Sequence, residues 1–319
     1  MRVALLVALL LSACDSPHHT SAVLVGDVLL ASEPGERIRA GQDPFRGVAA
    51  QLANADVTVA NLECSVARSG SPVDKEYTFR AEASALEILR QHVRAVSLAN
   101  NHSGDYGRGA LLETMTHLER AGVRYFGAGP NLRAAHEPLL LDSHGVKLAL
   151  LGYDEYQPRW FEANVNAPGV AWSEDEQVVS DIARARLNAD VVVPFLHWGW
   201  ETEDEPSARQ RALARKMIDA GAAAVVGAHP HRTQGVEYYR DRPIIYSLGN
   251  FVFDLCESDA ERLGWLLRLE LDRCGVARWS TLLVRIDAEG TPWPDPSALT
   301  PCGRRERGRV EACKNGALP

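Results

Sequence analysis

The stretch Ala95-Val-Ser-Leu-Ala-Asn-Asn-His102 passes from a short, mainly apolar run directly into three side chains that can bind a metal ion. A run of this length and composition is typical of a buried strand. In α/β sheets, binding sites form at the carboxyl ends of the strands. The stretch therefore predicts a central strand that ends at a functional site.

The same transition recurs at four other places along the chain. The apolar runs 22–26, 57–60, 191–196 and 223–227 lead, in that order, to Asp27, to Glu63, to His197, and to His229 with His231. Each residue alone has an ordinary explanation: a turn, a surface charge, a helix cap or a buried histidine. Five such transitions that use four of the ten histidines favour a shared metal site.

Segments with helical spacing of apolar residues separate these runs. They cover 46–55, 81–92, 109–121, 173–188 and 206–220. Strands that alternate with helices predict a layered α/β domain. A hairpin around 143–145 and further hairpin-like strands between 235 and 287 indicate that antiparallel strands are interleaved with it. We expect one domain over 22–290 and a short Pro- and Cys-containing tail over 291–319.

Composition excludes several other classes of protein. The chain has 319 residues, 46% of them hydrophobic, and a formal charge of -8. This balance is that of a globular protein rather than a disordered chain. The negative charge argues against nucleic acid as a partner. No internal apolar run approaches the 20 or so residues that a membrane-spanning helix needs.

The N-terminus has the pattern of an exported lipoprotein. Residues 1–13 combine a basic start with a short apolar stretch, and Leu11-Ser-Ala-Cys14 resembles the processing site at which such a cysteine is lipidated. The alternative is an ordinary cleaved signal peptide in which Cys14 is incidental. We expect residues 14–21 to be a tether and the protein to be extracytoplasmic, in the cell envelope, anchored to the membrane by lipid.

The cysteine count agrees with export. Five cysteines follow Cys14, and an oxidising compartment permits disulfides. We expect up to two disulfides among Cys256, Cys274, Cys302 and Cys313. Cys64 adjoins Glu63 and is predicted to stay reduced. The chain has no Cys-x-x-Cys pair, which argues against a structural zinc knuckle.

Long motifs in a fixed order resemble the CapA family of capsule-synthesis proteins, which are associated with bacterial poly-γ-glutamate. They are Val25-Gly-Asp-Val28, Asn61-Leu-Glu63, Leu98-Ala-Asn-Asn-His-Ser-Gly-Asp-Tyr-Gly107, His197-Trp-Gly199, Gly227-Ala-His-Pro-His231 and Ile245-Tyr-Ser-Leu-Gly-Asn-Phe-Val-Phe-Asp254. The segments 75–80 and 127–129 also fit. This family is related to the calcineurin-like metallophosphoesterases. The resemblance implies an α/β fold in the form of the four-layer α/β/β/α sandwich of the metallo-dependent phosphatases.

The resemblance also implies a set of metal ligands. By matching motif these are Asp27, Glu63, Asn101, His197, His229 and His231, which could hold one or two divalent ions, with Glu63 as the bridge. The donor set suits manganese, iron or zinc. His102 is left as a general acid or substrate clamp. Leu29 occupies a position where the phosphoesterase pattern has a histidine, and Thr202 replaces a frequent tyrosine, so the ion count and the substrate side stay open.

Further residues are candidates for supporting the ligands or contacting substrate. They are Asn61, Asn100, Asp105, Lys75, Arg80, Glu201 and Asn250. Lys75 and Arg80 could bind an anionic polymer or could be solvated loop charges. The acidic cluster that includes Glu201 would repel a polyanion unless it points away. Asn250 most simply positions the His-x-His loop.

The resulting expectation is a protein that serves capsule or poly-γ-glutamate biosynthesis, export or anchoring. As an enzyme it would be a metal-dependent hydrolase or transferase. The alternative is a non-catalytic accessory subunit that binds an anionic polymer such as poly-γ-glutamate, or a membrane synthase. The histidine missing at Leu29 favours the accessory role, whereas the other ligands favour catalysis.

Overall fold

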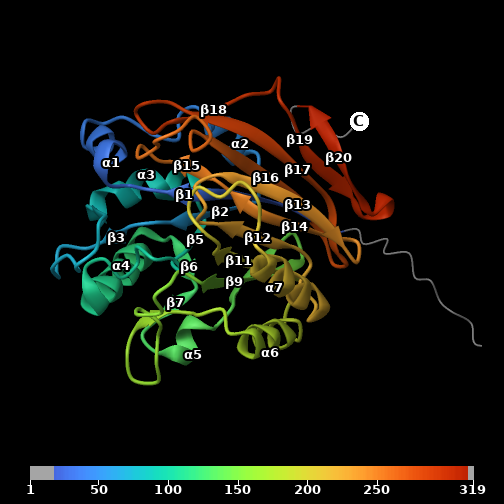
Figure 1. Cartoon of the computed structure of the whole chain (residues 1–319), viewed down its shortest axis with the longest axis horizontal. Coiled ribbons are helices and arrows are strands. Elements are labelled where there is room, and N and C mark those ends of the chain that lie inside the picture. Colours follow the sequence, from blue (N-terminus) through green and yellow to red (C-terminus); the bar gives the residue numbers. More distant parts are fainter. Residues whose placement is uncertain (1–17, 315–319) are drawn as a thin grey trace, which may run out of the picture.

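The computed structural model describes residues 18–314, which form two facing β-sheets with helices on both outer surfaces (Figure 1). The larger sheet has the strand order β20-β19-β17-β16-β1-β2-β5-β6, with β15 paired to β1 and β18 to β17. The smaller has the order β13-β14-β12-β11-β9-β8. The predicted four-layer α/β/β/α sandwich is confirmed.

The strands of the larger sheet come from both ends of the chain. They are β1 (His19–Val28), β2 (Val57–Leu62), β5 (Ala95–Ser97), β6 (Arg124–Phe126), β15 (Asn250–Val252), β16 (Leu263–Asp272), β17 (Gly275–Ile286), β18 (Pro292–Pro294), β19 (Leu299–Arg304) and β20 (Arg309–Lys314). The first four are parallel to one another, whereas β16 pairs antiparallel with β1. The sheet is therefore mixed, as the interleaved patterns predict.

The smaller sheet is built from the middle of the chain. Its strands are β8 (Leu139–Ser143), β9 (Val146–Asp154), β11 (Val191–His197), β12 (Val225–Ala228), β13 (Thr233–Tyr239) and β14 (Arg242–Leu248). The predicted hairpin is the β8–β9 pair, which turns at His144 and Gly145. Two short ladders lie outside the sheets: β3 (Ser65–Val66) with β4 (Arg80–Ala81), and β7 (Ala128–Gly129) with β10 (Gly169–Val170).

Three separate apolar cores define the four layers. The helices α1 (Ser32–Arg39), α2 (Ala49–Ala53), α3 (Leu86–His92) and α4 (Gly107–Ala121) belong to the larger sheet's side, and α5 (Leu132–Ala135), α6 (Asp175–Ala185) and α7 (Ala208–Asp219) to the smaller sheet's side. Along β1, Val23 and Val25 pack in the first core, beneath the α3 and α4 side chains, whereas Leu24 packs between the sheets. The third core joins α6 and α7 to the smaller sheet. This alternation is the two-residue period of a strand buried on both faces.

No helix within 18–314 is long and apolar enough to cross a membrane. The signal peptide predicted for residues 1–13 and the candidate lipidation site Cys14 lie outside the described residues.

The C-terminal segment differs from the expected tail. Residues 292–314 form strands β18, β19 and β20, which extend the larger sheet beyond β17. Cys302 and Cys313 are buried and form a disulfide across the β19–β20 hairpin. The expectation of a separate tail fails because strands at a sheet edge carry too few apolar residues to stand out in a Pro-containing sequence.

The cysteine prediction holds in part. Cys302 and Cys313 are joined and Cys64 is a buried free thiol, as predicted. Cys256, however, is free, so two disulfides among the four downstream cysteines are excluded. Cys256 precedes β16 and Cys274 follows it, and a ten-residue strand spans about 33 Å, far beyond the reach of a disulfide.

Candidate metal centre

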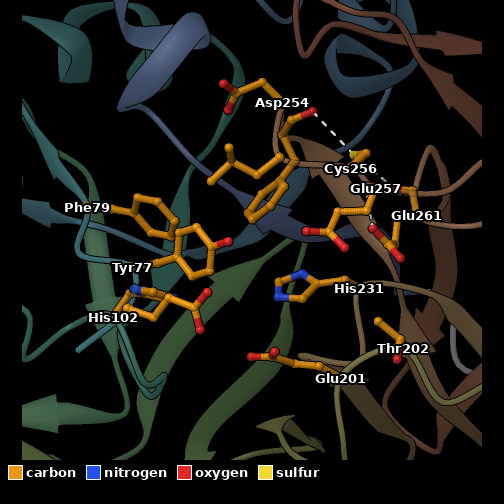
Figure 2. Close-up of a pocket in the computed structure, with 13 residues that line it drawn as sticks. Tyr77, Phe79, His102, Glu201, Thr202, His231, Asp254, Cys256, Glu257 and Glu261 are labelled. Carbon is orange, nitrogen blue, oxygen red and sulfur yellow. Dashed lines mark hydrogen bonds between the residues drawn. The ribbon is translucent and has the colours of Figure 1, made fainter.

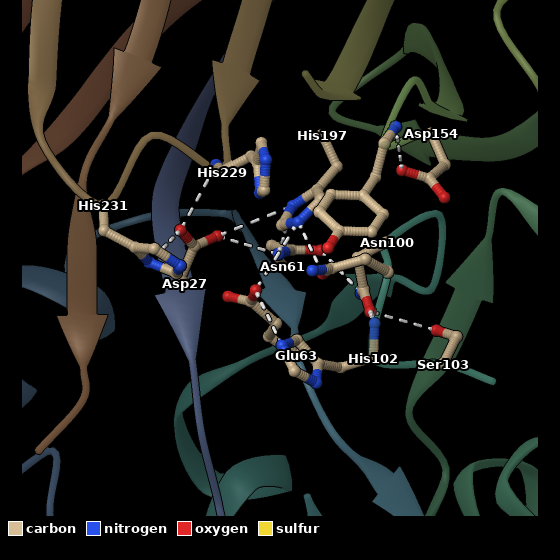
Figure 3. Close-up of polar contacts among 12 residues, drawn as sticks. Asp27, Asn61, Glu63, Asn100, His102, Ser103, Asp154, His197, His229 and His231 are labelled. Atoms are coloured by element: carbon tan, nitrogen blue, oxygen red, sulfur yellow. Dashed lines mark hydrogen bonds and ion pairs between the residues drawn. The ribbon is translucent and has the colours of Figure 1, made fainter. Parts of the chain in front are cut away.

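The side chains that the sequence places after five strands meet at one end of the sandwich. Asp27 belongs to β1, Glu63 follows β2, Asn101 follows β5, His197 ends β11, and His229 with His231 follows β12 (Figure 3). Asp27 and Glu63 are fully buried, and His197 and His229 are nearly so. Both sheets thus contribute strand ends to the same cluster.

Two groups of three donors lie close enough to hold an ion each. Asp27, Glu63 and His197 form one group, and Glu63, His229 and His231 form the other, with the ligand atoms of each group within 4.8 Å of one another. Glu63 belongs to both groups. A carboxylate shared in this way is the arrangement of a bridged pair of divalent ions.

The buried atoms of this cluster fit a cation. Both carboxylate oxygens of Glu63 and Nδ1 of His229 are buried and have no hydrogen-bond partner among the described residues. Burial, together with the charge of Asp27, raises the pKa of Glu63 well above its usual value. Burial also lowers the pKa of His197 and His229 well below the usual range, so both imidazoles are neutral, as metal ligands must be.

Asparagines orient the ligands. Asn61 donates from Nδ2 to Asp27 Oδ1 at 2.8 Å and lies 3.2 Å from His197 Nδ1. Asn101 Oδ1 lies 2.9 Å from His197 Nε2. Asn100 donates to the side-chain oxygen of Asn61 at 3.0 Å and accepts from the backbone N–H of His102 at 3.1 Å. The loop after β5 is thereby locked to strand β2.

The His-x-His turn has an unusual backbone. His229 and His231 have φ values of 97° and 56°, a region that side chains other than glycine rarely occupy. The backbone N–H of His229 donates to Asp27 Oδ2 at 3.3 Å, and His231 Nδ1 lies 2.8 Å from Asn250 Oδ1. Strain of this kind is typical of functional sites, where surrounding contacts hold it in place.

His102 is held by a carboxylate and an ammonium group. Its Nδ1 lies 2.7 Å from Asp105 Oδ2, and Lys75 Nζ reaches Asp105 Oδ1 at 2.9 Å, His102 Nδ1 at 3.1 Å and the Asn101 carbonyl oxygen at 3.0 Å. Lys75 is therefore part of the site rather than a solvated loop charge. Arg80 lies outside this network, with its guanidinium 4.3 Å from the ring centroid of Tyr106.

A cavity of about 500 Å³ opens beside His102 and His231 (Figure 2). Its lining combines the aromatic side chains of Tyr77, Phe79 and Phe253 with five carboxylates, which are Glu76, Glu201, Asp254, Glu257 and Glu261. The charge of Glu76 and burial raise the pKa of Tyr77, and Glu257 and Glu201 add to this effect. The mouth of the candidate metal centre is thus strongly acidic.

Comparison with known proteins supplies the family. The model of the family described as "Bacterial capsule synthesis protein PGA_cap" matches residues 21–255. The chain belongs to this family. It is 32% identical to the "PGA biosynthesis protein CapA" of Bacillus subtilis over 86% of this chain and 73% of that protein. It is 33% identical to the "Capsule biosynthesis protein CapA" of Bacillus anthracis over 86% of this chain and 69% of that protein.

The fold of this PGA_cap protein also has a solved relative. A 5'-nucleotidase precursor from Thermus thermophilus superposes on 86% of this chain and 56% of its own, with a TM-score of 0.54 and 12% sequence identity. At this identity the likeness concerns the fold alone. It agrees with the metallophosphatase-type architecture that the sequence predicts.

Several side chains at the site of this PGA_cap protein were not predicted from the sequence. Glu76, Tyr77, Glu257 and Glu261 line the cavity, and Asp154 lies at the end of β9 beside the ligands. The loop residues have no periodic pattern that would mark them. The clearest signal was Asp154, because it ends an apolar strand as the ligands do. Leu29 is fully buried in the apolar core, so this position supplies no ligand.

Proposed function

We propose that this member of the capsule synthesis family is a hydrolase or transferase, dependent on divalent metal, that acts in capsule or poly-γ-glutamate biosynthesis. The observation that carries the proposal is Glu63, a fully buried carboxylate with two unpartnered oxygens that belongs to both groups of ligands. Burial raises the pKa of this carboxyl group, so it holds a proton when no metal is bound, and a bound cation would favour its ionised form.

The residues that would hold the metal are those gathered at the strand ends. They are Asp27, Glu63, Asn101, His197, His229 and His231, for one or two ions of manganese, iron or zinc. Bound divalent ions polarise a phosphoryl or carbonyl oxygen and make a bound water acidic. Asn61 and Asn250 would fix the orientation of Asp27 and His231 through the contacts described above.

His102 is the residue placed to move a proton. Asp105 holds Nδ1, and the ring lines the cavity, so Nε2 is the atom available to a substrate. Burial lowers the pKa of His102 to about 4, although Asp105 acts in the opposite direction. The free imidazole is therefore neutral at pH 7. A negatively charged substrate next to Nε2 would favour its protonation, which is the form that a general acid requires.

The second candidate function is a non-catalytic accessory role in which the protein binds polymer or a membrane synthase. The observations that favour it are the buried Leu29, which removes one potential ligand, and the acidic cavity, which repels a polyanion from the metal centre. In this case the metal would serve only to stabilise the fold.

The deciding experiment measures metal and turnover on the same samples. We expect one or two divalent ions per chain in the wild type and fewer in His229→Ala. Replacing His102 by Ala should leave the metal content unchanged and reduce hydrolysis of a phosphoester or γ-glutamyl substrate by about 10²- to 10⁴-fold. His144→Ala is the control, because that side chain is 65% exposed. A wild type that binds metal, turns over neither substrate class and is still needed for capsule would establish the accessory role.

The location follows from the N-terminal pattern. The predicted tether over 14–21 is too long, because residues 19–21 pair with β16 as the start of β1. We propose that residues 1–13 are removed, that the residues between Cys14 and β1 tether the domain and that Cys14 carries the lipid, so the protein works in the cell envelope on the extracytoplasmic side. Anionic polymer, and a membrane synthase or export complex, are the partners this location would allow.

A further inference from the structure

A second cavity lies on the smaller sheet's side of the molecule. It has a volume of about 480 Å³ and is lined by residues of α5, of α6 and of the segment that joins β9 to β10. In Figure 1, α5 and α6 lie together below the smaller sheet. The lining residues are separate from those of the acidic cavity and from the candidate metal ligands.

A buried carboxylate holds several of the side chains that line this cavity in position. Asp181 is fully buried and accepts four hydrogen bonds. Its Oδ2 lies 2.7 Å from His136 Nδ1 and 3.2 Å from the Tyr153 hydroxyl, and its Oδ1 lies 2.7 Å from Gln177 Nε2 and 2.6 Å from Arg184 Nη2. An ionised carboxylate can only accept, so Nδ1 of His136 carries the proton.

His136 is thereby aimed at the cavity. Its side chain is only 4% exposed, yet the ring lines the cavity, and Nε2 has no hydrogen-bond partner among residues 18–314. In the tautomer that carries its proton on Nδ1, the Nε2 atom accepts a hydrogen bond. Because the ring lines the cavity and Asp181 fixes its orientation, Nε2 can bind a ligand there that offers an N–H group.

Two guanidinium groups line the same cavity as this acceptor. Arg133 is 85% exposed, and its nearest carboxylate, that of Glu137, is 4.0 Å away. Arg184 bonds Asp181 through Nη2, but its side chain is 55% exposed, which leaves other N–H groups for a ligand. Guanidinium groups recognise carboxylates in a bidentate way. The cavity thus offers guanidinium donors for carboxylates together with an acceptor for N–H.

We propose that this cavity binds a segment of a polyamide that carries a carboxylate on each unit, as poly-γ-glutamate does. The amide N–H of the ligand donates to His136 Nε2, and neighbouring carboxylates pair with Arg133 and Arg184. This inference rests on the proposed role in polymer biosynthesis but not on catalysis.

One segment runs from this cavity to the candidate metal centre. Val165, in the segment between β9 and β10, lines the polymer cavity, and Tyr156, earlier in the same segment, places its ring edge-on to that of His229 at 5.4 Å. In β9, Tyr153 bonds Asp181 while the next residue, Asp154, pairs with the ligand His197 of β11. A polymer bound at His136 would therefore contact elements that also contact the candidate metal ligands.

The test measures binding of a fluorescently labelled γ-linked glutamate decamer to the metal-loaded mature protein. Arg133→Glu should weaken binding about tenfold or more and reduce its dependence on salt. Arg39→Glu is the matched control, since Arg39 is also an exposed helical arginine with a carboxylate 3.9 Å away, and it should leave affinity unchanged. His136→Gln should weaken binding while circular dichroism shows a folded protein.

Two results would overturn the inference. One is equal weakening by Arg133→Glu and Arg39→Glu, which would show only general attraction between charges. The other is a wild type that does not bind the decamer at micromolar protein. Metal content and turnover are measured on the same samples, so the failure of this site and the failure of the proposed catalysis are distinguishable.

Discussion

Glu63 shows why single side chains carry the functional argument. It adjoins Cys64, whose thiol is fully buried and whose pKa burial raises to about 12, so the cysteine is inert. The carboxyl group of Glu63 has the same burial but no hydrogen bond within the described part of the chain, and His197 Nε2 lies 3.5 Å from its Oε1. A buried thiol needs no further explanation, whereas a buried carboxyl group without a hydrogen bond is either protonated or bound to a cation.

Replacing Glu63 by Gln should remove most of the stabilisation that metal provides. A ligand at 100 times its dissociation constant stabilises the fold by about 2.7 kcal/mol, and a bridging position contributes to both ions. Urea unfolding with and without a chelator measures this difference for wild type and variant. Glu87→Gln, at a side chain that is 62% exposed, should behave as the wild type does. Equal chelator sensitivity of wild type and Glu63→Gln would contradict the bridging role.

Asp154 should make the stability of the fold depend on pH. Burial raises its pKa to about 7, against an ordinary value of 3.8. The folded state thus holds a proton that the unfolded state releases, so the stability of the wild type falls as pH rises from about 4 to 7 and levels off above it. Asp154→Asn keeps an acceptor for the backbone N–H of Tyr156 and removes this loss.

The variant should therefore be more stable than the wild type at pH 8, by about 4 kcal/mol at most, and equal to it near pH 4. Chelated protein is used so that metal binding does not contribute. Parallel curves of unfolding free energy against pH for the two proteins would show that Asp154 is ionised throughout.

The sequence pattern predicted the candidate metal ligands well, but it predicted the residues around them less well. Each predicted ligand follows an apolar strand, and parallel strands place such residues at one sheet edge. Lys75 could not be assigned because its ion pair with Asp105 joins residues 30 positions apart in loops. The cavity carboxylates lie in loops too, where no period relates sequence to orientation.

At the scale of elements, strand β12 determines where the His-x-His turn lies. Its residue Gly227 packs against β14 so closely that a Cβ atom there would be 2.1 Å from the Tyr246 carbonyl oxygen and 2.3 Å from Trp198 Nε1. Those two groups are themselves hydrogen-bonded at 2.9 Å. Because Gly227 has no side chain, strand β12 can lie directly against Tyr246 of β14 and against Trp198, which follows β11. This contact lies two residues before His229.

Gly227→Ala should destabilise the protein by about 1–3 kcal/mol or more, because backbone and ring must separate to admit the methyl group. It should also lower metal occupancy by displacing His229. Gly235→Ala is the matched control in strand β13 of the same sheet, since nothing lies within 4 Å of a Cβ atom at that position. Thermal unfolding and metal analysis are the readouts. A Gly227→Ala protein with wild-type stability and metal content would refute this account.

Elements with strong periodicity were the ones that the sequence predicted. The β8–β9 hairpin, α4 and α7 form where apolar spacing and turn residues agree. Helix α1 was missed because Pro34 and Gly35 interrupt its pattern, and α2 is shorter than the predicted 46–55. The C-terminal strands depend on pairing with β17, which local sequence does not reveal.

At the scale of the whole molecule, the sandwich depends on both ends of the chain. Strand β1 lies between β2 and β16, so the strand that carries Asp27 is completed by residues more than 200 positions away. The described chain starts at His18, whose ring reaches the carbonyl oxygen of His144 in the β8–β9 turn. A tether at Cys14 would therefore attach at this turn, whereas the ligands lie at the opposite, carboxyl ends of β9 and β11.

This geometry makes the anchor testable separately from the chemistry. If Cys14 is acylated, the wild type should fractionate with membranes, and Cys14→Ser should appear in the soluble fraction or accumulate as an unprocessed precursor. Stable anchoring requires several acyl chains, because one chain binds only marginally. Metal content of the released variant should equal that of the wild type, because the attachment point and the ligands lie at opposite strand ends. Mass spectrometry that finds Cys14 unmodified, or joined in a disulfide, in membrane-associated protein would contradict the lipid anchor.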